Sequence, residues 1–575
     1  MVLDRIPRMK TAAAFIAAFA GTAILLSAQG QRTTFTVVEA SIPQMQAALA
    51  NRLVTSRQLV EQYLIRLGLY EDRLNAALAV NAKALEDADR LDQERAQGTL
   101  RGPLHGIPIA LKDNIHTTDM PTTGGALVFA GYIPPYEATL TTHLKAAGAI
   151  IIAKTGLTEL ANWVAGNPNA MPGNYNAIGG FAFNPYDPRP DPRPDPGDGR
   201  PVLPTGGSSS GIGTAANLWA GSVGSDTGGS IISPANANML VGIRPTIGRI
   251  SRHGVIPITA DHDTAGPMTR TVADSAIMLG AMEGATPDPN DAATRTCTPP
   301  PNRDYTKFLN AGGLKGKRIG VPRAFYLDAM TLPGEKSPRG GVNPDQARVM
   351  SEAIAVLQQQ GAVVVDPADI PSFIAKNADD SFPLWDFCAG AEHAKGKDQN
   401  CSINFKYGMK RDYNAWLASL GPSAPVKTLT EHREWNLAHA KAGAIKYGQS
   451  RFDISDEMDL VADKARLNAD DAKDRRLSRD QGIDGVLKAH RLDAFITPGS
   501  SGAGIAARAG YPIIAVPFGM VPNSPQQPFP KGFDARPAPY GVGFVGAQCS
   551  EPLLIEIAYA FEQATRKRVP PPLFP

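Results

Sequence analysis

The segment Gly-Ser-Asp-Thr-Gly-Gly-Ser over residues 224–230 contains the residue types that an acyl-transfer site needs. Two glycines directly before Ser230 allow a tight turn whose backbone N–H groups point the same way beside the hydroxyl, which suits the oxyanion of a tetrahedral intermediate. A serine hydroxyl becomes nucleophilic only when a base takes its proton. Lys112 ends the apolar run 107–111, and a lysine buried at a strand end readily loses its charge and then acts as a base. The alternative is an ordinary strand-end lysine that meets solvent.

A second serine-rich segment competes with this one. Gly-Ser-Ser-Ser-Gly over residues 207–211 fits the G-x-S-x-G pattern of a nucleophile elbow, with Ser209 at its centre. That pattern would predict a serine esterase or another hydrolase with a Ser-His-Asp triad. A nucleophile elbow follows a buried strand, whereas prolines interrupt residues 198–205. The context therefore disfavours Ser209 as the nucleophile.

Together these motifs, in this order, resemble the amidase signature family. The resemblance rests on Gly-Ile-Pro-Ile-Ala-Leu-Lys-Asp-Asn-Ile from Gly106, on Gly-Gly-Ser-Ser-Ser-Gly from Gly206, and on the segment around Ser230. It covers roughly residues 40–280 and 490–570, and further matching segments lie at 241–251, 263–268, 510–512 and 562–565. Ser-Ile-Ile-Ser-Pro from Ser230 is more similar to peptide amidases and related exported members than to the tRNA-dependent amidotransferases.

The resemblance implies a hydrolase of carbon–nitrogen bonds in linear amides, which converts a carboxylic amide to the acid and ammonia or an amine through an acyl-enzyme. It implies a Ser-cisSer-Lys triad in which Ser230 is the nucleophile, Ser208 relays the proton after a cis peptide bond, and Lys112 is the base. No cofactor or metal is implied, and the partner is a small-molecule amide. We expect the acyl pocket to involve the middle of the chain and residues near 163–175. The implied oxyanion hole consists of the backbone N–H groups of Thr227, Gly228 and Gly229.

The sequence departs from the family pattern at two points. Ser208 and Ser230 lie 22 positions apart, a shorter spacing than family members usually have. Ile232 stands where the family commonly has arginine. Two alternatives therefore stay open beside the amidase: a serine esterase or hydrolase that uses Ser209, and a catalytically silent binding protein on an amidase scaffold.

The strands and helices that the sequence pattern predicts around these residues indicate an α/β fold. The resemblance implies an amidase-signature fold, with a mixed sheet flanked by helices. Strand-like runs at 107–111 and 149–153 surround a helix at 139–147, which predicts parallel strands. The Pro-rich stretch 184–204 predicts an exposed, solvated loop. Residues 31–575 form the expected amidase domain, with a core at 40–284 and 490–570 and an inserted, mostly helical cap at 285–489. Within these regions we expect strands at 318–322, 493–498, 510–520 and 540–545, and helices at 345–360, 429–447 and 551–566.

The first thirty residues resemble a secretory signal peptide. Three basic residues precede an uncharged apolar run at 11–28, and Ala28-Gln29-Gly30 supplies small residues at a cleavage site. An uncleaved anchor is the alternative, because the run is near the lower length of a spanning helix. Either way we expect export to the periplasm or medium, with no membrane span after cleavage.

Composition excludes several classes of protein. With 575 residues, 43% hydrophobic and 19% charged, the chain is neither disordered nor fibrous. Removing residues 1–30 leaves equal numbers of basic and acidic residues, so nucleic acid is a poor partner. Among the four cysteines, Cys388 and Cys401 form the expected disulfide, because only a short polar stretch separates them. His432 and His439 are expected at the surface, and the oligomeric state stays open.

Overall fold

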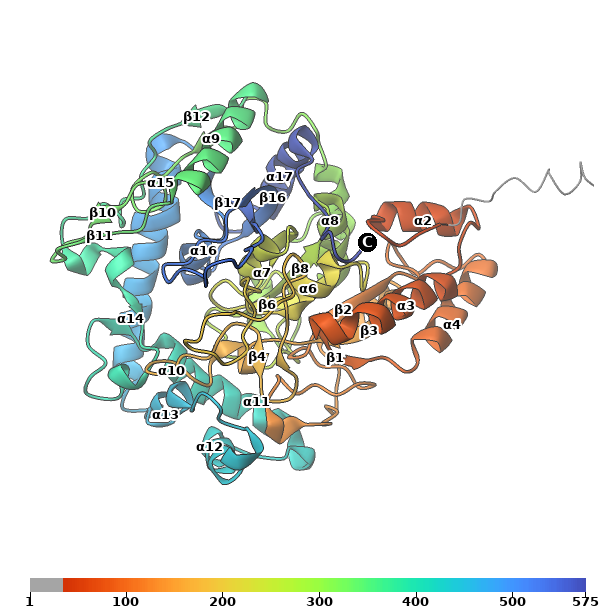
Figure 1. The fold of residues 1–575 in the computed structure, drawn as a ribbon, viewed down its shortest axis with the longest axis horizontal. Coiled ribbons are helices and arrows are strands. Elements are labelled where there is room, and N and C mark those ends of the chain that lie inside the picture. Colours follow the sequence, from red (N-terminus) through yellow and green to blue (C-terminus); the bar gives the residue numbers. More distant parts are fainter. Residues whose placement is uncertain (1–34) are drawn as a thin grey trace, which may run out of the picture.

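One mixed sheet of eleven strands runs through the computed structural model, which describes residues 35–575 (Figure 1). The strand order is β1-β3-β2-β6-β8-β7-β16-β17-β15-β9-β12. The signal peptide expected at residues 1–30 lies outside the described residues. The α/β class expected from the sequence is confirmed. The strands are β1 (Ala77–Val80), β2 (Pro108–Lys112), β3 (Ile150–Thr155), β6 (Ser222–Asp226), β7 (Val241–Arg244), β8 (Thr264–Thr269), β9 (Arg318–Gly320), β12 (Val363–Val365), β15 (Ala494–Pro498), β16 (Ile513–Val521) and β17 (Ala538–Val545).

Three neighbouring strands of this sheet are parallel. β2 pairs with β3 on one side and with β6 on the other, so the carboxyl ends of all three meet at one edge. α5 (Thr139–Ala146) precedes β3, as the strand–helix–strand pattern predicts. Because β2 and β3 are buried along their whole length, both faces need helical cover.

Helices cover both faces of the sheet. Along β16, Ile514 and Val516 belong to one hydrophobic cluster, whereas Ile513 and Ala515 belong to another, as alternation on a strand requires. The first cluster includes residues of α8, α9 and α17, and the second includes residues of α7, α15 and α16. The main helices are α2 (Ile42–Ala50), α3 (Ser56–Leu74), α4 (Ala84–Ala96), α6 (Ser209–Ala215), α7 (Ile232–Ala237), α8 (Val272–Met282), α9 (Pro344–Gln359), α10 (Asn404–Gly408), α11 (Asn414–Ser419), α12 (Leu429–Ala438), α13 (Ser450–Asp456), α14 (Lys464–Arg475), α15 (Asp484–His490), α16 (Ala503–Ala509) and α17 (Glu551–Thr565).

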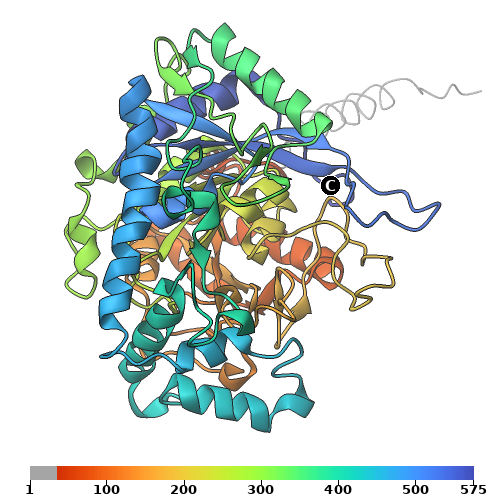
Figure 2. The same cartoon turned by 90° about the vertical axis from the view of Figure 1, so that its left-hand side faces the viewer.

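Residues 285–489, expected as an inserted cap, belong partly to the core. β9 and β12 both come from this section and extend the sheet beyond β15. The rest is mostly helical: α10 to α13 lie together at one end of the molecule (Figure 1), and α14 and α15 continue into one long helical run along its side (Figure 2). Aromatic residues of α10, α11 and α13 pack against residues near Trp163 in one further hydrophobic cluster. The boundary at residue 285 therefore does not separate the sheet from a cap.

Two side-chain predictions in this section have opposite outcomes. The Cys388–Cys401 disulfide is confirmed, and a second disulfide joins Cys297 to Cys549. The prediction for His432 is wrong, because α12 turns this ring into the aromatic cluster, where it is fully buried and shares a 2.8 Å hydrogen bond with the Tyr413 hydroxyl. Within residues 35–575, no helix combines the length and apolarity that crossing a bilayer requires.

Candidate active site

The shared carboxyl edge of the parallel strands holds the predicted residues. Lys112 is the last residue of β2, and Asp226 is the last residue of β6. Ser230 follows four positions later, just before α7 begins. Ser208 precedes α6, and the loop that carries it is joined to the loop after β3 by a hydrogen bond from the Ser209 N–H to the Gly156 carbonyl, at 2.9 Å. The topology therefore brings these residues to one end of the sheet.

The side chain of Lys112 is completely buried and hydrogen-bonded to neutral oxygens. Its Nζ donates to Ser225 Oγ at 2.9 Å and to the Ser225 carbonyl at 3.1 Å. Burial lowers the pKa of Lys112 to about 8, although the nearby carboxylates of Asp226 and Asp263 oppose the shift. A usable fraction of Lys112 is therefore neutral near physiological pH.

Ser225 is the residue of this site that sequence reasoning missed. Its hydroxyl accepts hydrogen bonds from both Lys112 and Asn114, the latter at 2.8 Å. No signal in the sequence indicates this contact, because it depends on the pairing of β2 with β6, in which Leu111 lies opposite Val223. Ser225 fixes the direction in which the Lys112 amine points.

Ser208 occupies the N-cap of α6, where its Oγ accepts a hydrogen bond from the Ser210 N–H at 3.2 Å. The cis peptide bond expected before Ser208 is absent: the three cis bonds within residues 35–575 all precede prolines. Two residues before Ser208, Gly206 adopts φ +71°, a conformation that favours glycine. Ser208 therefore joins the site as an extended cap residue.

Ser209 has a different environment from Ser230. It lies fully buried in the first turn of α6, and its Oγ donates to Asn174 Oδ1 at 3.0 Å. Ser230 is partly exposed and lines two cavities. Among the described residues, no hydrogen bond pairs Ser209 with a histidine, so the geometry of a nucleophile elbow is not met.

The Ser230 hydroxyl lies against the turn that leads into Ser208. A Cβ placed on Gly207 would be 2.8 Å from Ser230 Oγ, so only glycine leaves room for the hydroxyl there. Ser208 lies just before α6 and Ser230 lies just after β6, both in loops at the same edge of the sheet. A turn joins α6 to β6. Their short sequence spacing therefore does not rotate them to opposite faces of a helix. Within residues 35–575, no side-chain hydrogen bond yet joins Lys112 to Ser208 or Ser208 to Ser230.

The turn 227–229 is held by a buried ion pair beneath it. Asp226 accepts hydrogen bonds from the N–H groups of Gly229, at 2.8 Å, and Ile231, at 2.7 Å. Arg244 donates to the same carboxylate at 2.9 Å, and both side chains are fully buried. Gly229 adopts φ +131°, a conformation that side chains disfavour. Of the three residues expected to form the oxyanion hole, Gly229 thus uses its N–H to hold the turn, while Thr227 and Gly228 face a cavity.

Two cavities meet at Ser230. The first, which we call the relay-side cavity, has a volume of about 530 Å³ and includes Gly206 and Gly207 in its wall. The second, the aromatic cavity, has a volume of about 440 Å³. Its wall combines Trp163 with residues of the middle section, as expected for the acyl pocket. The aromatic cavity is lined by Ala161, Asn162, Trp163, Thr227, Gly228, Ser230, Ile258, Phe382, Pro383, Trp385, Asp386, Phe387, Ala389, Phe405, Arg451, Gly504 and Arg508.

Comparison with known proteins identifies the family. The family model described as amidase matches residues 58–555, which is most of the chain. The protein belongs to the amidase family. The chain is 34% identical to a probable amidase of Arabidopsis thaliana, over 94% of this chain and 92% of the plant protein. It is 33% identical to a putative amidase of Arthroderma benhamiae, over 89% of this chain and 79% of the fungal protein.

Solved structures place the fold in the same family. The native peptide amidase of Stenotrophomonas maltophilia superposes with a TM-score of 0.75 at 33% identity, covering 93% of this chain and 98% of that chain. An amidase family protein from Bacillus anthracis gives the same TM-score at 29% identity, covering 93% and 92%. The amidase-signature fold expected from the motifs is confirmed.

The Pro-rich loop of this amidase packs against the rest of the protein and reaches the site. Asp191, Arg193 and Arg200 line the relay-side cavity. The guanidinium of Arg193 lies 5.2 Å from the ring of Phe529, and that of Arg189 lies 4.3 Å from Phe533. Pro190, Pro192 and residues 194–197 are exposed, as expected, but the loop is not a free spacer, because Arg189 and Arg193 pack against aromatic residues far along the chain.

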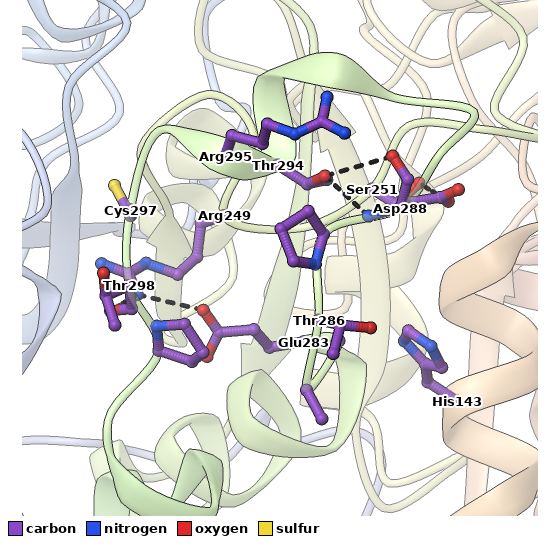
Figure 3. A pocket seen from close by; sticks show the side chains of 14 residues that line it. His143, Arg249, Ser251, Glu283, Thr286, Asp288, Thr294, Arg295, Cys297 and Thr298 are labelled. Carbon is purple, nitrogen blue, oxygen red and sulfur yellow. Dashed lines mark hydrogen bonds and ion pairs between the residues drawn. The ribbon is translucent and has the colours of Figure 1, made fainter.

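A third cavity of the amidase, of about 280 Å³, carries none of the predicted catalytic residues (Figure 3). Its main charged group, Arg249, is already paired with Glu283 at 3.0 Å and with Glu551 at 2.8 Å. Ser251 donates to Asp288 at 2.6 Å, but hydrogen bonds from Ser251 and Thr139 lower the pKa of Asp288 against the effect of burial, so this carboxylate is a weak base. The cavity therefore lacks an activated nucleophile.

Proposed function

We propose that this protein hydrolyses linear carboxylic amides through an acyl-enzyme, with Ser230 as nucleophile, Ser208 as relay and Lys112 as base. The observation that supports this best is a completely buried lysine with a pKa of about 8 at the strand edge next to the Ser230 loop. A lysine at its ordinary pKa would be almost fully protonated at neutral pH and could not serve as a base.

The proposed reaction moves one proton out and back. Neutral Lys112 takes the proton of Ser230 through Ser208 as Ser230 Oγ bonds to the amide carbon. The carbon–nitrogen bond then breaks, and the same relay returns the proton to the departing nitrogen. Water, activated by the same base, attacks the acyl-enzyme, releases the acid and restores Ser230. This route requires Ser208 to rotate from its cap bond toward Ser230 when the amide binds.

We assign the oxyanion hole to the backbone N–H groups of Thr227 and Gly228, while Gly229 holds the turn through its hydrogen bond to Asp226. The Asp226–Arg244 pair beneath the turn fixes the backbone before the substrate arrives, which is the preorganisation that charge stabilisation requires. Loss of one donor in such a hole lowers the rate by about 10²–10³. The Asp226 carboxylate accepts hydrogen bonds from the N–H groups of Gly229 and Ile231, the two neighbours of Ser230 in the chain. It therefore also sets the position of the nucleophile.

Labelling with a fluorophosphonate followed by peptide mass spectrometry tests the assignment. We expect label on Ser230 and no label in the Lys112→Ala protein, with circular dichroism showing that this variant is folded. Label on Ser209 would instead support the esterase. A folded protein that takes no label would support a binding protein on an amidase scaffold.

We also propose that the protein is exported, to the periplasm or the medium. Two disulfides within residues 35–575 suit an oxidising compartment, and residues 1–30 have the composition of a signal peptide. Fractionation of cells that express the full chain, with N-terminal sequencing of the product, tests this. An uncleaved chain in the membrane fraction would support an anchor, and a product retained in the cytoplasm with free thiols would contradict export.

A further inference from the structure

The wall of the aromatic cavity contains a higher share of aromatic residues than the chain as a whole. Five of its 17 lining residues are aromatic, whereas aromatic residues make up 7% of the chain. Such residues supply large, rigid apolar faces and prefer to pack against other rings. The five are Trp163, Phe382, Trp385, Phe387 and Phe405.

Packing outside the cavity holds these rings in place. Phe387 and Phe405 stack at 3.7 Å between centroids, and Trp163 meets Phe405 edge-on at 5.0 Å. The Trp163 indole also donates to Ser455 Oγ at 3.0 Å, and the Trp385 indole donates to Asp474 at 2.8 Å. The wall is therefore built before a ligand arrives, which lowers the entropic cost of binding a ring.

A disulfide braces the same wall. Cys388 directly follows Phe387, and it is bonded to Cys401 on the segment that leads to Phe405. These segments also pair as two short parallel strands, with the Cys388 N–H donating to the Ser402 carbonyl at 2.9 Å. The covalent link thus fixes the spacing of the two stacked rings.

The position of the relay decides which part of a substrate enters each cavity. The departing nitrogen must receive its proton from Ser208, which directly follows Gly207. Gly206 and Gly207 line the relay-side cavity and do not line the aromatic cavity. The leaving group therefore lies on the relay side, and the acyl group lies on the other side of Ser230, in the aromatic cavity.

The charges of the aromatic cavity disfavour cationic groups. Arg508 lies over Phe387 at 3.6 Å and is paired with Asp474 at 2.7 Å. Arg451 donates to the Ala389 carbonyl at 3.1 Å and forms no ion pair with any described residue from 35 to 575. Asp386, in the same wall, attracts the Arg451 guanidinium without forming an ion pair with it. Two guanidinium groups thus face one carboxylate in this cavity, which disfavours a further positive charge there.

We propose that the aromatic cavity is the acyl subsite and that the preferred substrates are carboxamides whose acyl part carries a neutral aromatic ring. This inference rests on the proposed function, because it assumes that Ser230 is acylated. The leaving amine lies on the relay side, in a cavity that the charged residues Asp191, Arg193 and Arg200 line.

The first test compares kcat/KM for four amides. N-acetylphenylalaninamide carries a ring on the acyl side, N-acetylalaninamide carries a methyl group, N-acetyllysinamide carries a cation, and acetanilide carries its ring on the leaving group. We expect the phenylalanine amide to exceed the alanine amide at least about tenfold, and the lysine amide to be the poorest of the three amino-acid amides. Equal rates for the phenylalanine and alanine amides, or a preference for acetanilide, would overturn the assignment.

Filling the cavity provides the second test. Gly504 lies in its wall on α16, and a Cβ placed there meets no atom within 4 Å, so we expect Gly504→Leu to narrow the cavity and leave the fold intact. Gly68 on α3 is a matched control, since it is also helical, exposed and free of neighbours within 4 Å. We expect Gly504→Leu to remove the preference for the phenylalanine amide while Gly68→Leu keeps it. An unchanged preference in folded Gly504→Leu would overturn the proposal.

Binding without turnover separates this inference from the proposed function. In the Ser230→Ala protein, tryptophan fluorescence reports ligands, because Trp163 and Trp385 line the cavity. We expect N-acetylphenylalaninamide to change the fluorescence at concentrations at which N-acetylalaninamide does not. Selective binding together with an inactive wild-type protein would support the subsite and contradict the amidase. Hydrolysis without selective binding would support the amidase and contradict the subsite.

Discussion

The pH dependence of acylation tests the role of Lys112 directly. Burial lowers the pKa of Lys112 from 10.5 to about 8. At pH 7 a lysine with a pKa of 10.5 would be neutral in about 0.03% of molecules, whereas a pKa of 8 makes about 9% neutral. The structure therefore increases the reactive form about 300-fold at pH 7. Because only the neutral amine accepts a proton, the rate must rise with pH until Lys112 has lost its proton.

The assay measures the second-order rate constant for labelling of Ser230 by a fluorophosphonate between pH 5.5 and 9.5. We expect a tenfold rise per pH unit well below pH 8, a midpoint near pH 8 and a plateau above it. The Ser230→Ala protein supplies the background at each pH. The profile of kcat/KM for amide hydrolysis should have the same midpoint, because both reactions begin with the same proton transfer.

The carboxylates near Lys112 shift its pKa in the direction opposite to burial. Asp226 and Asp263 both raise the pKa of Lys112 against the effect of burial. Burial raises the pKa of Asp263 itself to about 7, so its charge is present over much of the range in which Lys112 titrates. We expect Asp263→Asn to move the midpoint to lower pH. A flat profile, a midpoint that stays near pH 6.5 as for an ordinary histidine, or wild-type labelling of folded Lys112→Ala would refute the reasoning.

Three further substitutions follow from the same geometry. Lys112→Met should abolish hydrolysis. Because the folded pKa of Lys112 lies below its unfolded pKa, the free energy of unfolding of this variant relative to wild type should fall by about 3 kcal/mol between pH 8 and pH 10.5, which urea unfolding at the two pH values measures. Gly207→Ala places a methyl group 2.8 Å from Ser230 Oγ and should slow labelling about 10²-fold, whereas Gly68→Ala should not change it. Replacing Cys388 and Cys401 by serine should lower the free energy of unfolding by about 3 kcal/mol and raise KM for aromatic acyl amides with kcat nearly unchanged; a KM equal to wild type would contradict the bracing of Phe387.

Much of the sheet could be predicted because its strands can be recognised from the hydrophobic pattern of their own residues. The apolar runs that became β2, β3, β15 and β16 are continuous and buried along most of their length, which hydrophobic pattern alone detects. The closing helix α17 (Glu551–Thr565) and the cap-region helix α9 (Pro344–Gln359) likewise end within two residues of their predicted bounds. At the site, the residue types around Ser230 and the position of Lys112 at a strand end were visible for the same local reason.

The parts that could not be predicted depend on partners distant in the sequence. Cys297 and Cys549 are separated by 252 positions, so proximity could not pair them. Arg189 and Arg193 of the Pro-rich loop pack on rings more than 300 positions later, and nothing in the Asp-, Pro- and Arg-only run 187–196 reveals this. Strand β12 (Val363–Val365) has only three residues and gains its place by pairing with β9. Each of these contacts exists only after the chain has folded.

Burial lowers the pKa of two lysines at the strand edge, Lys112 and Lys154, to about 8, so the groups around each lysine decide which one can serve as a base. Lys154, on β3, lies 3.4 Å from the buried carboxylate of Asp113, so its deprotonation would leave that carboxylate without its partner in the interior. Lys112 donates only to the oxygens of Ser225, while the nearby carboxylate of Asp226 already has Arg244 as its partner at 2.9 Å. Removing a proton from Lys112 therefore breaks no ion pair among the described residues. The pairing of Asp226 with Arg244 thus fixes the turn before Ser230 and frees Lys112 to exchange its proton.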